Sequence, residues 1–178
     1  MLHAYQLVHK HNNVPKERII LMMYDDIADA PENPYKGNVI NYPGGENLYT
    51  PDVEKAYVGD DVTPENFIGV LLKDPKLIAA NKKVLNSTSE DFVFIYFTDH
   101  GAPSLVSFPD DVLTASTLKK TLKKMQEQNS FNKMVIYVEA CESGSMFADE
   151  MNPKQNIYAV TAASYNEPRF LMLLLSLI

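Results

Sequence analysis

The sequence has one cysteine, no surplus of positive charge and no long apolar run, and each shortage excludes a class of protein. A single cysteine, Cys141, cannot form an intramolecular disulfide, so it is either a buried thiol or a reactive one. The net charge of −7 argues against a nucleic-acid partner, because no stripe of Lys and Arg offsets it. No segment approaches the roughly 20 apolar residues that a membrane span needs, and the closing "FLMLLLSLI" is too short.

The chain start lacks the features of a secretory signal peptide, since it has no cationic segment, no long apolar core and no cleavage site. It has instead an amphipathic pattern, with Leu2, Tyr5, Leu7 and Val8 apolar, which predicts a helix that ends at "HNNVP". A domain rarely begins inside a helix with nothing before it. We therefore expect the sequence to be truncated at this end.

The rest of the chain has the pattern of one globular α/β domain, and its 178 residues are enough for a real core. Apolar runs typical of buried strands alternate with amphipathic segments typical of helices. Strands are predicted at residues 18–24, 92–97, 134–138 and 157–161, helices after Thr63 and after Thr114 or Ser116, and a loop at residues 31–50 with a short hairpin around Val39 and Ile40. This alternation favours a parallel sheet covered by helices on both faces.

Two of the predicted strands end on residues that can carry chemistry. Residues 92–97 lead into His100, and residues 134–138 lead into Cys141. Catalytic groups of open α/β sheets gather beyond the carboxyl ends of the strands, and neighbouring strands lie about 5 Å apart. A cysteine is a good nucleophile only as a thiolate, and a nearby histidine can take or balance its proton. The two strand ends therefore predict a cysteine–histidine pair.

Small residues surround this predicted pair. Gly101 removes a side chain where its backbone N–H can face a developing oxyanion, with the Cys141 N–H as the natural second donor. The small residues from Ser143 to Ser145 allow a substrate backbone to approach, so Ser143 is a candidate substrate-binding residue. Taken singly, a strand-end cysteine is usually packed and a lone histidine is usually a surface residue. Their joint position after two successive strands favours catalysis.

Other polar features carry less weight. Adjacent acidic pairs such as Asp25–Asp26 are mostly solvated, and no phosphate loop or metal-ligand set accompanies them. His3 and His9 do not share a helix face, so neither a metal site nor a cofactor is expected. Asn86 begins an Asn-Ser-Thr glycosylation acceptor, which matters only if the chain enters the secretory pathway.

Four motifs then occur together and in order: "MMYDDIADAPENPYKGNVIN", "DVTPENF", "FIYFTDHGA" and "VEACESGSM". In these motifs the chain resembles the legumain family of asparaginyl endopeptidases, in the caspase-like clan of cysteine peptidases. The catalytic subunit of glycosylphosphatidylinositol transamidase is a weaker match. The resemblance implies a caspase-like three-layer α/β sandwich with a mostly parallel sheet. It covers a partial peptidase domain at residues 1–163 and leaves a divergent apolar tail at residues 164–178.

The resemblance also implies roles for single residues. Cys141 is the nucleophile, His100 the general base and acid, and Gly101 a backbone donor of the oxyanion hole. Glu139 matches an acid that helps hold the carboxamide of the substrate asparagine, and Asp99 matches an aspartate that can form a succinimide linked to ligase behaviour. The implied partners are proteins or peptides with accessible asparagine and cystatin-type inhibitors, and the implied location is lysosomal, vacuolar or secreted.

The sequence departs from the family at both ends. Family members begin with a strand and an Asn-Tyr-Arg-His-Gln-type segment that orient the catalytic histidine and line the specificity pocket, and these are missing here. In the family sheet, that first strand lies between the strands matching residues 18–24 and 92–97. After "YAVTAA" the similarity to the serine-rich pocket wall fails at Ser164. We therefore expect the isolated chain to express poorly and to show little peptidase activity.

The function that the sequence favours most is that of a legumain-type cysteine endopeptidase, which cleaves after asparagine. Two alternatives stay open. The chain is an inactive truncated isoform that serves at most as a binding decoy, or it is a transpeptidase or transamidase that uses the same pair and excludes water from the acyl-enzyme.

Overall fold

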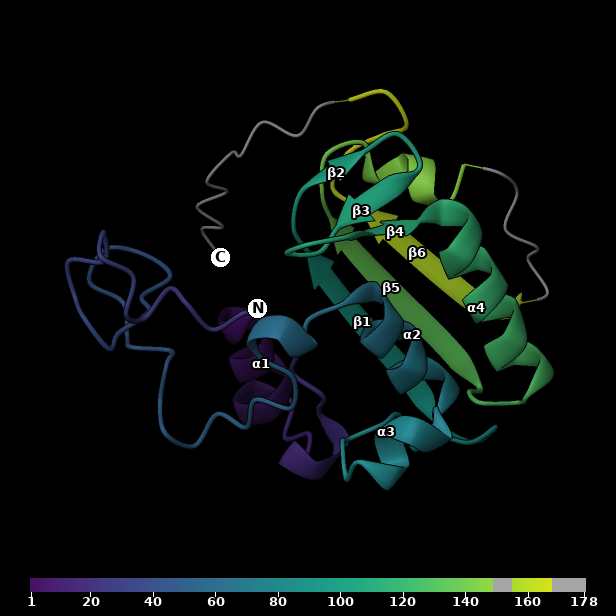
Figure 1. Cartoon of the computed structure of the whole chain (residues 1–178), viewed down its shortest axis with the longest axis horizontal. Coiled ribbons are helices and arrows are strands. Elements are labelled where there is room, and N and C mark those ends of the chain that lie inside the picture. Colours follow the sequence, from purple (N-terminus) through teal and green to yellow (C-terminus); the bar gives the residue numbers. More distant parts are fainter. Residues whose placement is uncertain (149–154, 168–178) are drawn as a thin grey trace. The chain divides into compact units, whose positions relative to one another are not determined.

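The computed structural model describes residues 1–148 and 155–167 of the chain. The chain divides into two units, Met1–Leu85 and Asn86–Ile178, each with its own packing. Figure 1 labels the helices and strands of both units. Most of the predicted apolar tail, residues 168–178, lies outside the described residues.

The second unit is built on a parallel sheet. Its strands are β1 (Phe92–Thr98), β5 (Lys133–Glu139) and β6 (Ile157–Thr161), in the order β1-β5-β6 (Figure 1). Every pairing in this sheet is parallel, and each strand lies within two residues of its predicted bounds. The prediction of an α/β fold with a parallel sheet is therefore confirmed.

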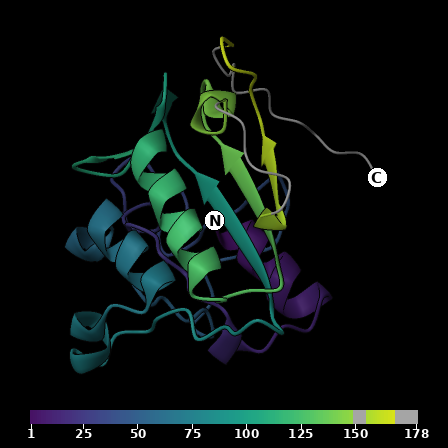
Figure 2. The same cartoon turned by 90° about the vertical axis from the view of Figure 1, so that its right-hand side faces the viewer.

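One face of this sheet is buried against the unit's own helix. Helix α4 (Ala115–Glu127) runs alongside the sheet in both views (Figures 1 and 2), and its N-cap Thr114 accepts a hydrogen bond from the Thr117 N–H at 3.2 Å. The sheet side chains that face inward alternate along the strands, as a pleated sheet requires. The buried side chains of helix and sheet are Leu118, Leu122, Met125, Val93, Met134, Ile136 and Val138.

The alternate side chains of the same strands lie on the other face and are much more open. Phe92 is 74% exposed and Tyr158 is 67% exposed, and Phe94 and Tyr137 form an edge-to-face pair with ring centroids 5.5 Å apart. Because Cα partners in a parallel ladder point the same way, these aromatic rings share one surface. Within the second unit, α4 is therefore the layer on one face only.

A small antiparallel meander separates β1 from α4. Its strands are β2 (Gly101–Ala102), β3 (Leu105–Ser107) and β4 (Val112–Thr114), paired in the order β2-β3-β4. The sequence did not predict it, because strands of two or three residues are too short to show an alternating pattern. Its buried residues Val106, Phe108 and Leu113 add to the core of the unit.

The first unit begins with the predicted amphipathic helix. Helix α1 (Leu2–Gln6) continues as the π-helix η1 (Leu7–His11), and the buried residues Leu2 and Tyr5 pack with Leu21 and Val53. The apolar positions predicted the helix, and the wider turn is a local feature that periodicity does not report.

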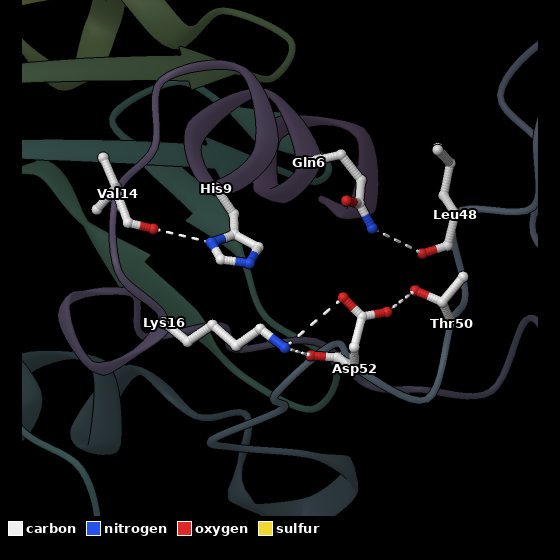
Figure 3. Close-up of polar contacts among 7 residues, drawn as sticks. All are labelled: Gln6, His9, Val14, Lys16, Leu48, Thr50 and Asp52. Atoms are coloured by element: carbon white, nitrogen blue, oxygen red, sulfur yellow. Dashed lines mark hydrogen bonds and ion pairs between the residues drawn. The ribbon is translucent and has the colours of Figure 1, made fainter.

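Hydrogen bonds tie this helix and its following turn to a distant loop of the same unit (Figure 3). The Gln6 side-chain N–H donates to the Leu48 carbonyl at 3.3 Å, and Lys16 Nζ donates to the Asp52 carbonyl at 2.7 Å. His9 Nδ1 lies 2.8 Å from the Val14 carbonyl, which closes the end of the helix. His9 is thus occupied by a local contact.

The predicted strand at residues 18–24 is wrong. After the 3₁₀ turn η2 (Lys16–Arg18), the chain is extended but makes only one ladder bridge, Met22 with Tyr57. The bonds around that bridge, such as the Met23 N–H to the Tyr57 carbonyl at 3.1 Å, pair it with a segment that itself forms no strand. Only Leu21 of residues 18–24 is buried, and a strand also needs a regular neighbour for its backbone groups.

The predicted helix of the first unit is confirmed, and the predicted hairpin is present only in reduced form. Thr63 caps α2 (Pro64–Leu72) by accepting a bond from the Asn66 N–H at 3.1 Å, and α3 (Pro75–Ala79) follows. The 3₁₀ turn η3 (Gly59–Asp61) precedes the cap. In the long loop, the hairpin consists of one antiparallel bridge between Ile40 and Asn47.

Lys55 is a cation of this unit with two close polar partners. Its Nζ lies 2.7 Å from Asp25 Oδ2 and 2.6 Å from the Tyr49 hydroxyl. The hydrogen bond to Asp25, and next the one to Tyr49, raise the pKa of Lys55 above its usual value. A raised folded-state pKa stabilises the fold below the unfolded pKa of 10.5, and this contribution is lost as the pH rises above that value.

We expect Lys55→Met to lower the free energy of unfolding by about 1–3 kcal/mol, because it leaves the largely buried Asp25 carboxylate without its cation. The check is urea unfolding followed by circular dichroism, since the chain has no tryptophan. The control is Lys123→Met, whose lysine is 70% exposed in an i,i+4 pair. The difference between the two variants should shrink above pH 10.5. Equal effects of the two variants at neutral pH would contradict the assignment.

Candidate active site

The ends of β1 and β5 lie side by side, as the sequence predicted. Thr98 is the Cα partner of Glu139 in the parallel ladder, and one residue later the Asp99 N–H donates to the Glu139 carbonyl at 3.3 Å. His100 and Cys141 therefore leave the sheet from neighbouring strands at the same edge. This edge is the carboxyl end, where α/β sheets carry their chemistry.

The two strand ends approach each other closely at Gly101. A Cβ placed on this glycine would lie 2.3 Å from the Cys141 carbonyl oxygen, 2.9 Å from Ala140 Cβ and 3.3 Å from the Cys141 nitrogen. No side chain fits against backbone at such a distance. Glycine is therefore required because the residue after His100 contacts the backbone of the cysteine.

Hydrogen bonds fix the backbone of His100 while its side chain remains exposed. The His100 N–H donates to Asp99 Oδ1 at 2.6 Å, and the His100 carbonyl accepts from the Ser107 N–H at 2.9 Å. Because His100 and Ser107 form a hydrogen-bonded pair, the next pair, Gly101 and Val106, is a non-hydrogen-bonded one. The Gly101 N–H is consequently directed away from β3.

The segment after Cys141 folds into the 3₁₀ turn η4 (Ser143–Met146). Ser143 has 0% exposure, and its hydroxyl accepts a hydrogen bond from the Ala163 N–H at 3.2 Å. The Gly144 N–H donates back to the Ala163 carbonyl at 3.0 Å. These two bonds form a clasp, which we call the Ala163 clasp, between the cysteine segment and the residues after β6.

The remaining predicted residues fall in different places. Glu139 ends β5 with a half-buried side chain, beside the candidate pair. Asn86 is exposed in a loop before β1, whereas His100 follows the other end of that strand. Sequence reasoning treated Ser145 only as a small residue that lets a substrate backbone approach, whereas its buried hydroxyl accepts a hydrogen bond from the Ser104 N–H at 2.7 Å. Its position in the "SGS" run was a signal only for small size.

Two kinds of feature are absent from residues 1–148 and 155–167. No group of three or more His, Cys, Asp or Glu side chains is placed to hold a metal ion. No helix in this part of the chain is long and apolar enough to cross a membrane.

The model of the peptidase C13 family matches residues 1–174 of this chain. The chain belongs to the peptidase C13 family. Among curated relatives, it is 49% identical to mouse legumain over 170 residues, 94% of this chain and 38% of the relative. It is 45% identical to human legumain over 170 residues, 94% of this chain and 39% of the relative. It is 47% identical to the Arabidopsis thaliana vacuolar-processing enzyme delta-isozyme over 167 residues, 93% of this chain and 35% of the relative.

The C13 match agrees with the resemblance seen in the sequence motifs. The chain spans well under half the length of these relatives. The matched part includes the whole candidate site, from β1 to the Ala163 clasp, because the family model runs through residue 174.

Proposed function

We propose that this chain carries the reaction centre of a cysteine endopeptidase that hydrolyses peptide bonds after asparagine. The observation that supports it best is the contact of Gly101 with the backbone of Cys141, because it brings the residue next to His100 against the nucleophile. Membership of the C13 family supports the same function. In this proposal Cys141 is the nucleophile and His100 the general base and acid.

The proposed reaction proceeds through an acyl-enzyme. His100 takes the proton of the Cys141 thiol, the thiolate sulfur forms a bond to the carbonyl carbon of the substrate asparagine, and the π electron pair moves to the oxygen. When the intermediate collapses, the C–N bond breaks and the His100 imidazolium gives its proton to the leaving amine. A water molecule deprotonated by His100 then hydrolyses the thioester and restores the thiol.

The oxyanion formed in the first step needs donors fixed in advance. We assign the Gly101 and Cys141 N–H groups to it, because the Gly101 N–H is directed away from β3 and the two backbones are in contact. Glu139, half-buried beside the pair, is proposed to help hold the asparagine carboxamide. Ser143 is fully buried, so we propose that it supports substrate binding by fixing the loop after β6.

The proposed specificity predicts a large difference in kcat/KM between substrates. A polar pocket that binds a carboxamide rejects side chains without those groups, because its own polar atoms are then left unpaired. We expect kcat/KM for asparagine peptides to exceed that for leucine or lysine peptides by on the order of 10⁴-fold. Aspartate should be accepted only where acid protonates it. Comparable rates on lysine and asparagine peptides would refute the specificity.

The test uses a chimeric mouse legumain in which the 170 matched residues are replaced by those of this chain. We call this protein the chimeric legumain. It places the candidate site in a chain of the relative's full length. Turnover of a fluorogenic asparagine peptide is the expected result, and a folded chimera without turnover would reject the proposal.

A transpeptidase is the second candidate, and one contact favours it. The His100 N–H that donates to Asp99 Oδ1 belongs to the nitrogen that would attack the Asp99 side-chain carbon, with loss of water, to form a succinimide. Asp99 is therefore our candidate succinimide. Mass spectrometry of the purified chain would detect it as a loss of one water, and an amine nucleophile added to the assay would give a ligated product.

The compartment and the inhibitors of the chain are further proposals. The legumains and vacuolar-processing enzymes among the relatives support a vacuolar or lysosomal compartment. Cystatin-type inhibitors are proposed as partners from the resemblance in the sequence motifs alone. In such a pathway the exposed Asn86 is a candidate glycosylation site. Removal of N-glycans should then increase the gel mobility of the wild-type chain but not of Asn86→Gln.

A further inference from the structure

Ser145 connects two segments that are far apart in sequence. It lies in η4, the turn after Cys141, and is 3% exposed. Its Oγ accepts a hydrogen bond of 2.7 Å from the Ser104 N–H. Ser104 lies in the two-residue turn between β2 and β3 and has a φ of +60°, which is unfavourable for a residue with a side chain. The bond from Ser145 therefore holds a turn that needs support.

The turn held by Ser145 belongs to the hairpin that begins at His100. The Ser107 N–H bonds to the His100 carbonyl at the base of the hairpin, and Gly101 is the first residue of β2. At its tip, the Ser104 carbonyl accepts from the Ala115 N–H at 2.8 Å, at the start of α4. Because the hairpin is short and bonded at both ends, a shift of its tip is transmitted to its base.

We propose that Ser145 is a positioning residue that sets the His100 imidazole against the Cys141 thiol. This role rests on the proposed function, because it assumes that the two side chains act as a pair. Ser145 follows Cys141 by only a few residues. Its hydrogen bond to Ser104 therefore fixes the position of the hairpin that carries His100 and Gly101 relative to the cysteine. The hydroxyl touches no reacting atom in this role, and it acts through Ser104.

A positioning role and a merely structural one change the reactivity of the thiol in opposite directions. Loosening of the fold around the half-buried Cys141 would expose the thiol and speed its alkylation. Loss of the imidazole partner would slow alkylation at mildly acidic pH, because the thiolate is the nucleophile and a histidine promotes its formation. The sign of the change therefore separates the two roles.

The experiment is alkylation of the chimeric legumain by iodoacetamide at mildly acidic pH, with the adduct on the Cys141 peptide measured by mass spectrometry. Cys141 is the single cysteine of the segment taken from this chain, so the adduct on its peptide reports this site. The variants are Ser145→Ala and the nearly isosteric pair Ser145→Thr and Ser145→Val, which differ by the hydroxyl. The matched control is Ser87→Ala, because Ser87 is also buried and its hydroxyl donates to the Ser130 carbonyl at 2.5 Å, at the far end of β1.

We expect Ser145→Ala and Ser145→Val to slow alkylation about three- to tenfold, toward the rate of His100→Ala, because the thiolate loses its partner. Ser145→Thr and Ser87→Ala should stay near the wild-type rate. The Thr/Val comparison decides the question if Ser145→Ala does not fold. An unchanged or faster rate in Ser145→Val than in Ser145→Thr, with His100→Ala still slow, would overturn the positioning role alone. Equal rates for wild type and His100→Ala would overturn the proposed pair itself.

Discussion

Replacing Cys141 by alanine in the chimeric legumain should abolish cleavage after asparagine. No other thiol of this chain can form the acyl-enzyme, since Cys141 is its single cysteine. His100→Ala should lower kcat by about 10²–10⁴-fold, because it removes the proton transfer at both the acylation and the hydrolysis step. The measurement is kcat and KM with a fluorogenic asparagine peptide.

The matched control for the histidine is His11→Ala, an exposed histidine of the first unit. It should leave kcat unchanged. Circular dichroism of each variant shows whether the fold is retained. Substantial peptidase activity in Cys141→Ala would rule out the mechanism, whatever the behaviour of the histidine variants.

Gly101→Ala should lower activity about as much as the loss of an oxyanion donor, by about 10²–10³-fold in kcat. The added Cβ would lie 2.3 Å from the Cys141 carbonyl oxygen, so either the hairpin or the cysteine segment must move. Both movements displace the proposed donors from the oxyanion. The loss should appear in kcat more than in KM, because the donors act on the transition state.

The control for this variant separates backbone strain from crowding. Gly59 has a φ of +51°, and no atom lies within 4 Å of the position that an alanine Cβ would take, so Gly59→Ala adds strain without a clash. It should reduce stability slightly and leave kcat near the wild-type value. Activity of Gly101→Ala within about threefold of wild type, far above the loss of a donor, would show that the close contact has no part in catalysis.

The sequence predicted the sheet of the second unit because its strands are apolar runs and a clear helix separates the first two of them. The apolar runs at residues 92–97 and 134–138 also indicated the ends where His100 and Cys141 leave the sheet. The strand predicted at residues 18–24 was wrong, because an apolar run does not specify which segment pairs with its backbone. An apolar pattern favours burial without fixing it, since Phe92 in such a run is 74% exposed, and it does not specify the pairing partner.

The details of the site were predicted only in part. The need for glycine at position 101 was expected from chemistry, and the structure adds a steric reason, the contact with Cys141. The bond from Ser145 to Ser104 was not predictable, because it joins a side chain to a backbone N–H across 41 residues and leaves no pattern in either segment. Long-range contacts of single polar side chains become visible only in three dimensions.

The order of the strands in the sheet has a consequence for how the protein folds during synthesis. The order β1-β5-β6 is also the order of translation, so among the described residues no strand of this sheet has to be inserted between two strands made before it. The cysteine segment emerges just after β5, whereas the Ala163 clasp needs residues made after β6. Domains generally fold as units during synthesis, and a nascent chain released before Ala163 would lack both bonds of the clasp and would carry the cysteine on an unfastened loop.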